Sequence, residues 1–180
     1  MRLFTAILFD DETKDALCDV MDKLRSVTEK GNFTLRDNLH LTLNFIGETD
    51  KAKLVEKAMK EAVEAADISA FNLTFSGFGR FKRREGDICW VGVERNETLI
   101  RLQKELAERL INAGFALDGQ DYTPHLTLAR KARFGNKFIE REFAAAVPGI
   151  KQHVGRISLM KSERINGKLT YMEIFYVKLN

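Results

Sequence analysis

The chain has few of the residues and patterns that mark several common classes of protein. No apolar run approaches the ~20 residues that a membrane-spanning helix requires. The first residues lead directly into a strand-like segment, without a long apolar signal region. There are only two cysteines, Cys18 and Cys89, and they form no Cys-x-x-Cys pair. We therefore expect a cytoplasmic protein without membrane contact, in which both thiols are buried and reduced.

Sequence motifs of several enzyme classes are also missing. The chain contains no Gly-x-Ser-x-Gly elbow, no Walker phosphate-binding loop and no Gly-x-Gly-x-x-Gly motif. These absences argue against serine-hydrolase, P-loop and dinucleotide-binding chemistry. The composition, with 44% hydrophobic and 31% charged residues in 180, is that of an ordinary globular protein of one or two small domains.

Two of the three histidines belong to identical tetrapeptides. His-Leu-Thr-Leu occurs at residues 40–43 and again at residues 125–128. Because side chains alternate between the faces of a strand, each histidine shares a face with the threonine two residues later. A single histidine on a strand is more often structural than catalytic. Two copies with the same spacing instead indicate one site that contains His40, Thr42, His125 and Thr127.

The two motifs lie within a longer repeat. They are 85 residues apart, and the same offset relates Glu12 to Glu97, Leu17 to Leu102 and Phe75 to Met160. Chance similarity between common strand and helix patterns is the alternative explanation. A duplicated chain places equivalent strands about a pseudo-twofold axis, which would direct both motifs into one cleft. We therefore predict a single domain, residues 1–180, with lobes at about 1–85 and 86–180.

Hydrophobic periodicity and turn residues predict the individual elements. Strands are expected at residues 3–9, 38–46, 71–75, 88–93, 157–160 and 171–179, and a further strand begins at residue 125. Helices are expected after residues 10, 50 and 96 and near residues 138–145. Asp50 and Asn96 are expected to cap their helices. We expect Gly77 and Gly79 to end a strand, and His153 to lie in a surface loop.

Paired histidines could instead hold a metal ion. Zinc usually requires three or four protein ligands, and the motif strands offer no further Cys, Asp or Glu on the face that carries the histidines. We therefore expect no metal and no cofactor. The remaining chemistry is general acid-base transfer at a phosphodiester, in which one imidazole accepts a proton and the other donates one. The threonine hydroxyls would hold nonbridging phosphate oxygens.

Basic residues near the motifs indicate an anionic substrate, although solvated loops would explain each cluster equally well. Arg130 is the best candidate for a charged phosphate contact, because a guanidinium can contact two oxygens at once. Its position in the strand is a difficulty. Counting by twos from His125 places Arg130 on the core side unless the strand bends.

Aromatic residues near the motifs are candidates for stacking on a nucleobase. Phe78 and Phe81, beside the basic segment, and Tyr122, before the second motif, are the candidates that we select. Phe45 shares the strand parity of Leu41, which predicts burial. We expect Trp90 to pack within its own strand.

The motifs and their flanks resemble those of the 2H phosphoesterase superfamily, and most of all its RNA 2',3'-cyclic phosphodiesterase family, also called 2'-5' RNA ligases. The resemblance rests on the doubled motif, on Asn38-Leu39 before and 45–48 (Phe-Ile-Gly-Glu) after the first copy, and on Pro124 and Arg130 around the second. It implies a bilobal α+β fold in which antiparallel sheets line a central cleft and helices pack outside. It also implies metal-free hydrolysis of a ribose 2',3'-cyclic phosphate to a 2'-phosphomonoester, with His40 as proton donor and His125 as proton acceptor.

Three functions remain open from the sequence. The first is action on RNA with a 2',3'-cyclic phosphate end, such as a tRNA half, with reversible 2'-5' ligation by the same residues. The second is a related enzyme acting on 2'-5' oligonucleotides or small cyclic nucleotides. The third is a noncatalytic module that binds RNA ends, which would not need two titratable histidines. The predicted cleft suits a monomer.

Overall fold

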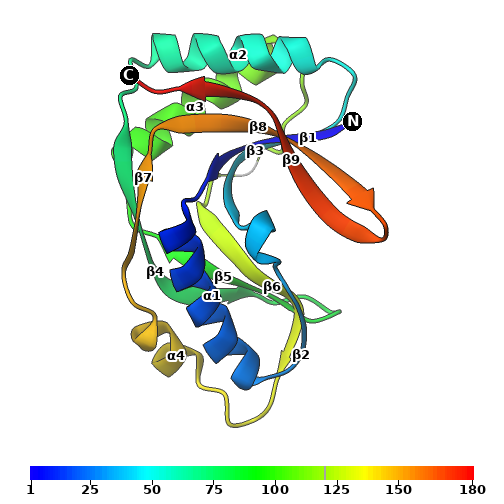
Figure 1. Ribbon diagram of the computed structural model, residues 1–180, viewed down its shortest axis with the longest axis vertical. Coiled ribbons are helices and arrows are strands. Elements are labelled where there is room, and N and C mark those ends of the chain that lie inside the picture. Colours follow the sequence, from blue (N-terminus) through cyan, green and yellow to red (C-terminus); the bar gives the residue numbers. More distant parts are fainter. Residues whose placement is uncertain (120) are drawn as a thin grey trace.

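The computed structural model describes residues 1–119 and 121–180, and these residues form two antiparallel sheets with four α-helices (Figure 1). The elements in chain order are β1 (Arg2–Leu8), α1 (Asp11–Ser26), β2 (Thr28–Phe33), η1 (Arg36–Asn38, a 3₁₀ turn), β3 (His40–Glu48), α2 (Ala52–Ala65), β4 (Phe71–Phe81), β5 (Asp87–Val93), α3 (Glu97–Asn112), β6 (His125–Phe134), α4 (Glu140–Ala146), β7 (Ile150–Val154), β8 (Arg156–Ile165) and β9 (Lys168–Lys178). The predicted α+β class with antiparallel sheets is confirmed.

Each sheet combines strands from both halves of the sequence. Sheet A has the strand order β3-β1-β8-β9, and sheet B has the order β2-β6-β5-β4-β7. The motif strands occupy equivalent places, because β3 pairs with β1 and β6 pairs with β5. However, β4 from the first half joins sheet B, whereas β8 and β9 from the second half complete sheet A. The two halves are therefore interlocked, and residue 85 does not divide one sheet from the other.

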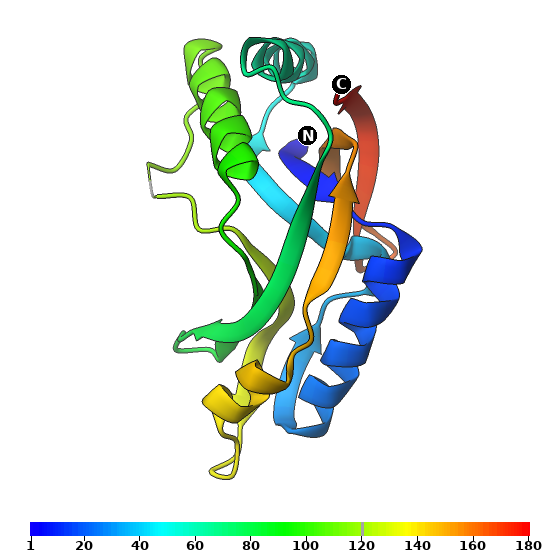
Figure 2. The ribbon, with the colours of Figure 1, turned by 90° about the vertical axis from the view of Figure 1, so that its left-hand side faces the viewer.

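The helices cover the outer faces of the two sheets. α2 and α3 pack against each other and against sheet A, while α1 and α4 pack against strands of sheet B (Figures 1 and 2). Helix α3 packs in this way because one of its faces is apolar. The leucines on that face are all buried: Leu99, Leu102, Leu106 and Leu110. Burying each such side chain contributes roughly 1.5–3 kcal/mol. No helix among the described residues is long and apolar enough to span a bilayer.

The two cysteines differ in their surroundings. Cys89 lies in β5 and is buried, and burial raises the pKa of its thiol to about 12. Cys18 lies in α1 and is only partly buried. Both are free thiols, as expected. The prediction that Cys18 is buried is wrong, because its side chain is only partly buried.

Helix capping follows the prediction at one of two positions. The Asn96 side chain accepts a hydrogen bond from the Leu99 N–H at 2.9 Å and caps α3 as expected. The prediction for Asp50 is wrong, because Lys51 is the N-cap residue of α2 and makes no side-chain cap. The Thr49 hydroxyl accepts the Lys51 N–H at 3.1 Å. Thr49 thus forms the local turn, and the helix begins after the position that Asp50 would cap.

Several strand predictions also needed correction. β4 does not end at Gly77 but continues to Phe81, because a register shift between Ser76 and Gly79 absorbs the positive φ of Gly77. β2 and β7 were not predicted. The β2 sequence is largely polar, so it lacks the apolar alternation that identifies a strand. His153 is exposed as expected, but it lies on β7 rather than in a loop.

Each motif strand contains an extra, unpaired residue at the last leucine of its His-Leu-Thr-Leu segment. In β3, Thr42 and Asn44 pair with the consecutive residues Ala6 and Thr5 of β1. In β6, residues 127 and 129 pair with the consecutive residues 90 and 89 of β5. These are β-bulges, which shift the alternation of side chains by one residue. Consecutive residues are consequently buried at both places, namely 43 and 44 in β3 and 128 and 129 in β6.

Thr5 stabilises the bulge in β3. Its buried hydroxyl accepts a hydrogen bond from the Asn44 N–H at 3.1 Å and donates one to the Asn44 carbonyl at 3.4 Å. A bulge leaves backbone groups of the strand without their usual partners, and a buried backbone group without a partner is costly. The Thr5 hydroxyl therefore replaces hydrogen bonds that a regular strand pair would make.

Replacing Thr5 with valine should lower the free energy of unfolding by about 1–3 kcal/mol, the cost of leaving buried polar groups without partners. Urea denaturation measures this difference. Thr74→Val is the matched control, since Thr74 is a strand residue whose hydroxyl makes no hydrogen bond within the described part of the chain. It should stay within about 0.5 kcal/mol of the original protein. Equal effects of the two substitutions would contradict the role of Thr5.

Candidate active site

His40 is held at the start of β3 by backbone and side-chain contacts. Its Nδ1 lies 2.6 Å from the Asn38 carbonyl oxygen, and its Nε2 lies 3.0 Å from the Thr42 hydroxyl. A carbonyl oxygen only accepts hydrogen bonds, so Nδ1 carries the proton in the neutral ring. Nε2 is then the nitrogen that gains or loses a proton. The predicted pairing of His40 with Thr42 on one face is confirmed by this contact.

The turn before β3 is itself tied to sheet A. The buried Asn38 side chain donates a hydrogen bond to the Leu169 carbonyl on β9 at 2.8 Å. One residue therefore orients the imidazole through its backbone and connects to β9 through its side chain. This fixes the position of His40 relative to the strand that carries Tyr171.

His125 repeats this arrangement on β6. Its Nδ1 lies 2.7 Å from the Thr123 carbonyl oxygen, again two residues earlier in the chain. The same tautomer follows for the neutral ring, so the lone pair is on Nε2 here too. Within the described residues, no hydrogen bond is made by the Nε2 of His125 or by the Thr127 hydroxyl. Both groups are thus available to a substrate.

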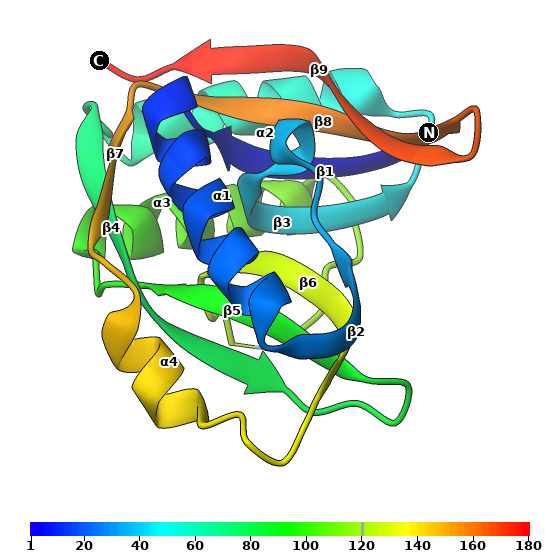
Figure 3. The ribbon, with the colours of Figure 1, turned by 60° about the horizontal axis from the view of Figure 1, so that its bottom comes forward.

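The two motifs lie next to each other although they belong to different sheets. β3 contacts β6, as Figure 3 shows. The Tyr122 hydroxyl, three residues before His125, donates a hydrogen bond to the Thr42 carbonyl at 3.0 Å. Arg130 of β6 is close enough to His40 for its charge to lower the pKa of that imidazole. The structure therefore brings the two motifs into one site.

Arg130 lies on the same face of β6 as His125 and Thr127, because the bulge at residues 128 and 129 shifts the alternation. Its side chain is exposed, and its charge acts on both His40 and Tyr171. The prediction that Arg130 faces the core is wrong, because the bulge supplies the irregularity that turns Arg130 toward the site. A guanidinium near both motifs is well placed for a phosphate.

The corresponding bulge in β3 exposes Phe45. We expected burial from simple alternation, but the ring is 46% exposed and the Arg2 guanidinium lies 5.0 Å from its centroid. Phe45 and Arg130 occupy the same place relative to their motifs. The two lobes thus present an aromatic ring and a cation, respectively, at equivalent positions.

Each histidine is flanked by two aromatic rings of its own sheet. The His40 ring centroid is 4.9 Å from that of Phe4 and 5.1 Å from that of Tyr171. The His125 ring centroid is 5.1 Å from that of Phe81 and 6.3 Å from that of Trp90. These rings restrict the orientations of the imidazoles. They also remove water from one side of each.

Removal of water has a consequence for the protonation of His40. Burial lowers the pKa of the His40 imidazole below its ordinary value, and the charge of Arg130 lowers it further. The hydrogen bond to the Asn38 carbonyl opposes these effects. In the free protein, His40 is therefore neutral at pH 7, and its Nε2 accepts the hydrogen of the Thr42 hydroxyl.

The three aromatic candidates for base stacking have different positions. Phe81 lies against His125, as described above. The prediction for Phe78 is wrong: it is 8% exposed and packs edge-on against Phe143 of α4, because the register shift in β4 turns it to the core. Tyr122 is half-buried, and its hydroxyl is engaged by Thr42. Its position indicates a link between the sheets rather than a free stacking surface.

The sequence analysis did not identify Phe4, Tyr171 and Trp90 as neighbours of the motif histidines. Phe4 and Tyr171 lie 36 or more residues from either motif in sequence, and nothing in the local pattern relates them to it. Trp90 lies two residues before Gly92, which pairs with His125, and this relation also comes from strand pairing rather than from the local sequence. Trp90 also covers Gly79, where a Cβ atom would lie 2.3 Å from the indole ring.

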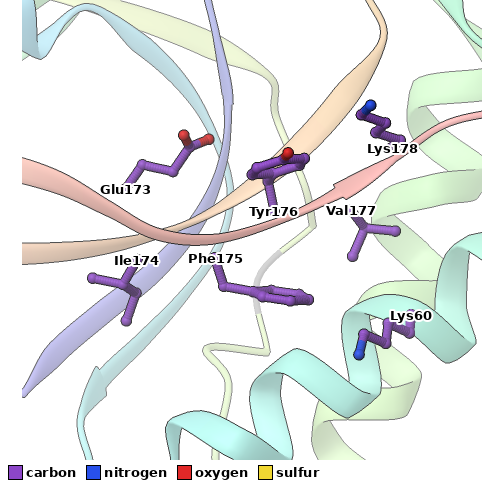
Figure 4. Close-up of a pocket in the computed structure, with 7 residues that line it drawn as sticks. All are labelled: Lys60, Glu173, Ile174, Phe175, Tyr176, Val177 and Lys178. Atoms are coloured by element: carbon purple, nitrogen blue, oxygen red, sulfur yellow. The ribbon is translucent and has the colours of Figure 1, made fainter.

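A hollow of about 680 Å³ lies elsewhere, between α2 and the edge strand β9 (Figure 4). It is lined by Lys60 and residues 173–178, and Phe175 extends from β9 toward Lys60. None of the motif residues lines it. Within the described residues, no group of three or more His, Cys, Asp or Glu side chains is arranged to hold a metal ion.

The pKa of His40 provides a test of this geometry. Titration followed by NMR of the ring protons should give a value below 6.5 in the free protein. Inorganic phosphate should raise it, since a nearby anion favours the imidazolium. Arg130→Gln should also raise it by removing a positive charge, whereas Arg141→Gln, at an exposed position on α4, should not. An unchanged His40 titration in Arg130→Gln would contradict the proximity of Arg130.

Comparison with known proteins identifies the family. The family model described as the 2'-5' RNA ligase superfamily matches residues 13–166. An RNA 2',3'-cyclic phosphodiesterase of Thermotoga maritima is 31% identical over 163 residues, covering 90% of this chain and 87% of the relative. A protein of the same name from Methanothermobacter thermautotrophicus is 29% identical over 183 residues, covering 97% and 98%.

A solved structure shows the same arrangement. Escherichia coli LigT complexed with 3'-AMP matches with a TM-score of 0.79 and 26% identity, and the match covers 99% of this chain and 97% of that one. The fold similarity and the sequence similarity therefore both extend over almost the whole chain. The chain belongs to the 2'-5' RNA ligase superfamily.

Proposed function

We propose that this protein is an RNA 2',3'-cyclic phosphodiesterase that hydrolyses the cyclic phosphate to a 2'-phosphomonoester by metal-independent acid-base catalysis. The observation that carries the proposal is the pair of imidazoles on adjacent strands, each with its Nδ1 committed to a backbone carbonyl. Each Nε2 is left to exchange a proton. Similarity to relatives of this name supports the choice of substrate.

The reaction requires one proton to be removed and one to be supplied. His125 takes a proton from the attacking water, and a new bond forms between the water oxygen and phosphorus. The bond between phosphorus and the ribose 3'-oxygen breaks, and His40 gives its proton to that oxygen. The phosphate remains on the 2'-oxygen. With an RNA 5'-hydroxyl in place of water, the same proton transfers in the same direction join RNA ends by a 2'-5' linkage: the 5'-oxygen bonds to phosphorus, and the 3'-oxygen leaves with the proton from His40.

The low pKa of His40 must be reconciled with its role as donor. His40 is neutral in the free protein because burial and Arg130 disfavour its charge. A bound phosphate brings a negative charge beside the ring and partly neutralises Arg130, and both changes favour the imidazolium. His40 thus becomes charged when substrate binds. Proton donation is then favourable, since an acid with a low intrinsic pKa releases its proton readily.

The remaining site residues hold the substrate. The hydroxyls of Thr42 and Thr127 contact nonbridging oxygens of the phosphate, and the exposed guanidinium of Arg130 offsets the charge that develops during attack. Phe81 offers its ring to a base next to His125. These contacts fix the cyclic phosphate between the two imidazoles.

Substitution of either histidine by alanine should lower the turnover of a 2',3'-cyclic phosphate by at least ~100-fold, the usual contribution of one acid or base. His153→Ala is the matched control and should retain activity, since His153 is exposed on β7 and its Nδ1 contacts Asn72. Rates are compared by chromatography of the products. Near-normal activity of His40→Ala or His125→Ala would refute the proposed mechanism.

Substrate and metal dependence separate the alternative functions. In the presence of EDTA, the protein should convert an oligoribonucleotide with a 2',3'-cyclic end to a product with a terminal 2'-phosphate. The same assay should include a 2'-5' dinucleotide and a cyclic mononucleotide. Preferential cleavage of the 2'-5' dinucleotide would favour a different substrate class. Tight RNA binding without cleavage of any of the three would favour a noncatalytic module.

A further inference from the structure

Cations continue along β6 beyond the phosphate site. Arg133 is exposed, and the bulge around Lys131, which has a φ of +53°, keeps Arg133 on the opposite side from the buried Ala132. Together with Lys30 of β2 and Arg83 and Arg84 of the β4–β5 turn, it forms what we call the basic ridge, which comprises Lys30, Arg83, Arg84 and Arg133. All four side chains belong to exposed residues.

The pairing of β2 with β6 places two cations of the ridge opposite each other. Lys30 pairs with Arg133, and the next pair downstream places Asn32 opposite Arg130. Like charges directly opposite on neighbouring strands destabilise a sheet. Sheet B therefore carries an unfavourable pair that an anion would relieve.

The β4–β5 turn adds two further cations from the other side. Gly86, with a φ of +117°, packs so closely on the Lys131 backbone that a Cβ atom there would lie 2.6 Å from its carbonyl carbon. The Arg133 guanidinium also donates to the Arg84 carbonyl at 3.4 Å. These contacts hold Arg84 beside Arg133. Figure 1 shows the turn and the end of β6 on the same side of the molecule.

Three acidic residues near the ridge are engaged by other cations. Glu85 pairs with Lys131 at 3.5 Å, whereas Asp87 and Glu140 both pair with Arg80 on the α4 side of the sheet. None of the salt bridges among residues 1–119 and 121–180 includes a ridge residue. The four charges therefore remain without acidic partners within the described chain.

The ridge is continuous with the proposed active site. The Arg83 guanidinium lies 5.9 Å from the centroid of the Phe81 ring, and the centroid of the same ring lies 5.1 Å from that of His125. A nucleotide stacked on Phe81 would thus have its neighbouring phosphate beside Arg83. Alternation of aromatic rings and cations is the usual way to hold single-stranded nucleic acid.

We propose that the basic ridge binds the backbone phosphates of single-stranded RNA on the 5' side of the cyclic end. This inference rests on the proposed function and narrows its substrate, from any 2',3'-cyclic phosphate to an RNA chain of several nucleotides. The binding is independent of sequence, because it uses phosphates rather than base edges. A cyclic mononucleotide occupies the catalytic site alone and does not reach the ridge.

The test compares two substrates in one variant. Arg83→Gln/Arg84→Gln/Arg133→Gln should lower kcat/KM for a ten-nucleotide RNA with a 2',3'-cyclic end at least about tenfold at low salt. The slope of log(kcat/KM) against log(salt concentration) should become shallower by about 2, because three phosphate contacts are lost. The kcat/KM for a cyclic mononucleotide should stay within about twofold, since the ridge is outside the catalytic site. An equal loss on both substrates, or no loss on the RNA, would overturn the inference.

The matched control removes the same total charge elsewhere. Lys23→Gln/Arg101→Gln/Lys104→Gln changes three exposed residues of α1 and α3. It should leave both activities within about twofold. The change in net charge affects only long-range attraction, which salt screens, and no ridge residue is replaced. A loss on RNA as large as that of the ridge variant would show that net charge, not the ridge, attracts the RNA.

Two further measurements separate failure of the ridge from failure of the proposed function. Binding of an RNA with a terminal 2'-phosphate, followed by fluorescence anisotropy, needs no turnover and should weaken only in the ridge variant. Arg133→Gln should also raise the urea midpoint, since it removes the repulsion from Lys30. Absence of turnover on every substrate, with ridge-dependent RNA binding, would reject the hydrolase and retain the ridge. A lower midpoint with unchanged RNA binding would give Arg133 a purely structural role.

Discussion

The last leucine of the His-Leu-Thr-Leu segment is an extra, unpaired residue in both motif strands, and the composition of the site depends on it. Without the bulges, regular alternation would turn Arg130 and Phe45 into the core. With them, Arg130 shares a face with His125, and Phe45 is exposed beside the other motif. The backbone irregularity therefore brings a charge into a site that otherwise contains only imidazoles and hydroxyls. Thr5 supplies the hydrogen bonds that this irregularity needs in β3.

The interlocked sheets explain how two halves of the chain make one site. β8 and β9 complete the sheet of the first motif, and β4 completes the sheet of the second. Each histidine therefore has aromatic neighbours that come from distant parts of the sequence, such as Tyr171 for His40. These neighbours remove water from the His40 ring and lower its pKa. The lowered pKa of His40 thus originates in neighbours that strand pairing, and not the local sequence, brings to it.

Charged residues of sheet B differ in whether they have acidic partners. Lys30 lies opposite Arg133, and the ridge lacks acidic partners within the described residues. On the core side of the same sheet, by contrast, Arg80 pairs with both Asp87 and Glu140. Arg80 therefore has two carboxylate partners, whereas the ridge arginines are exposed to solvent. Such a contrast is expected where a polyanion supplies the missing charge.

The sequence alone determined the two motifs and their shared spacing, because these follow from local alternation and from identity between repeats. The α+β class came from the family resemblance that the motifs carry. It also identified His40, Thr42, His125 and Thr127 as one group. Only the tertiary structure decided which face Arg130, Phe45 and Phe78 occupy, since a single extra residue in a strand reverses every later side chain. It also decided the aromatic neighbours of each histidine. Those depend on strand pairing between segments far apart in the chain, which no local pattern contains.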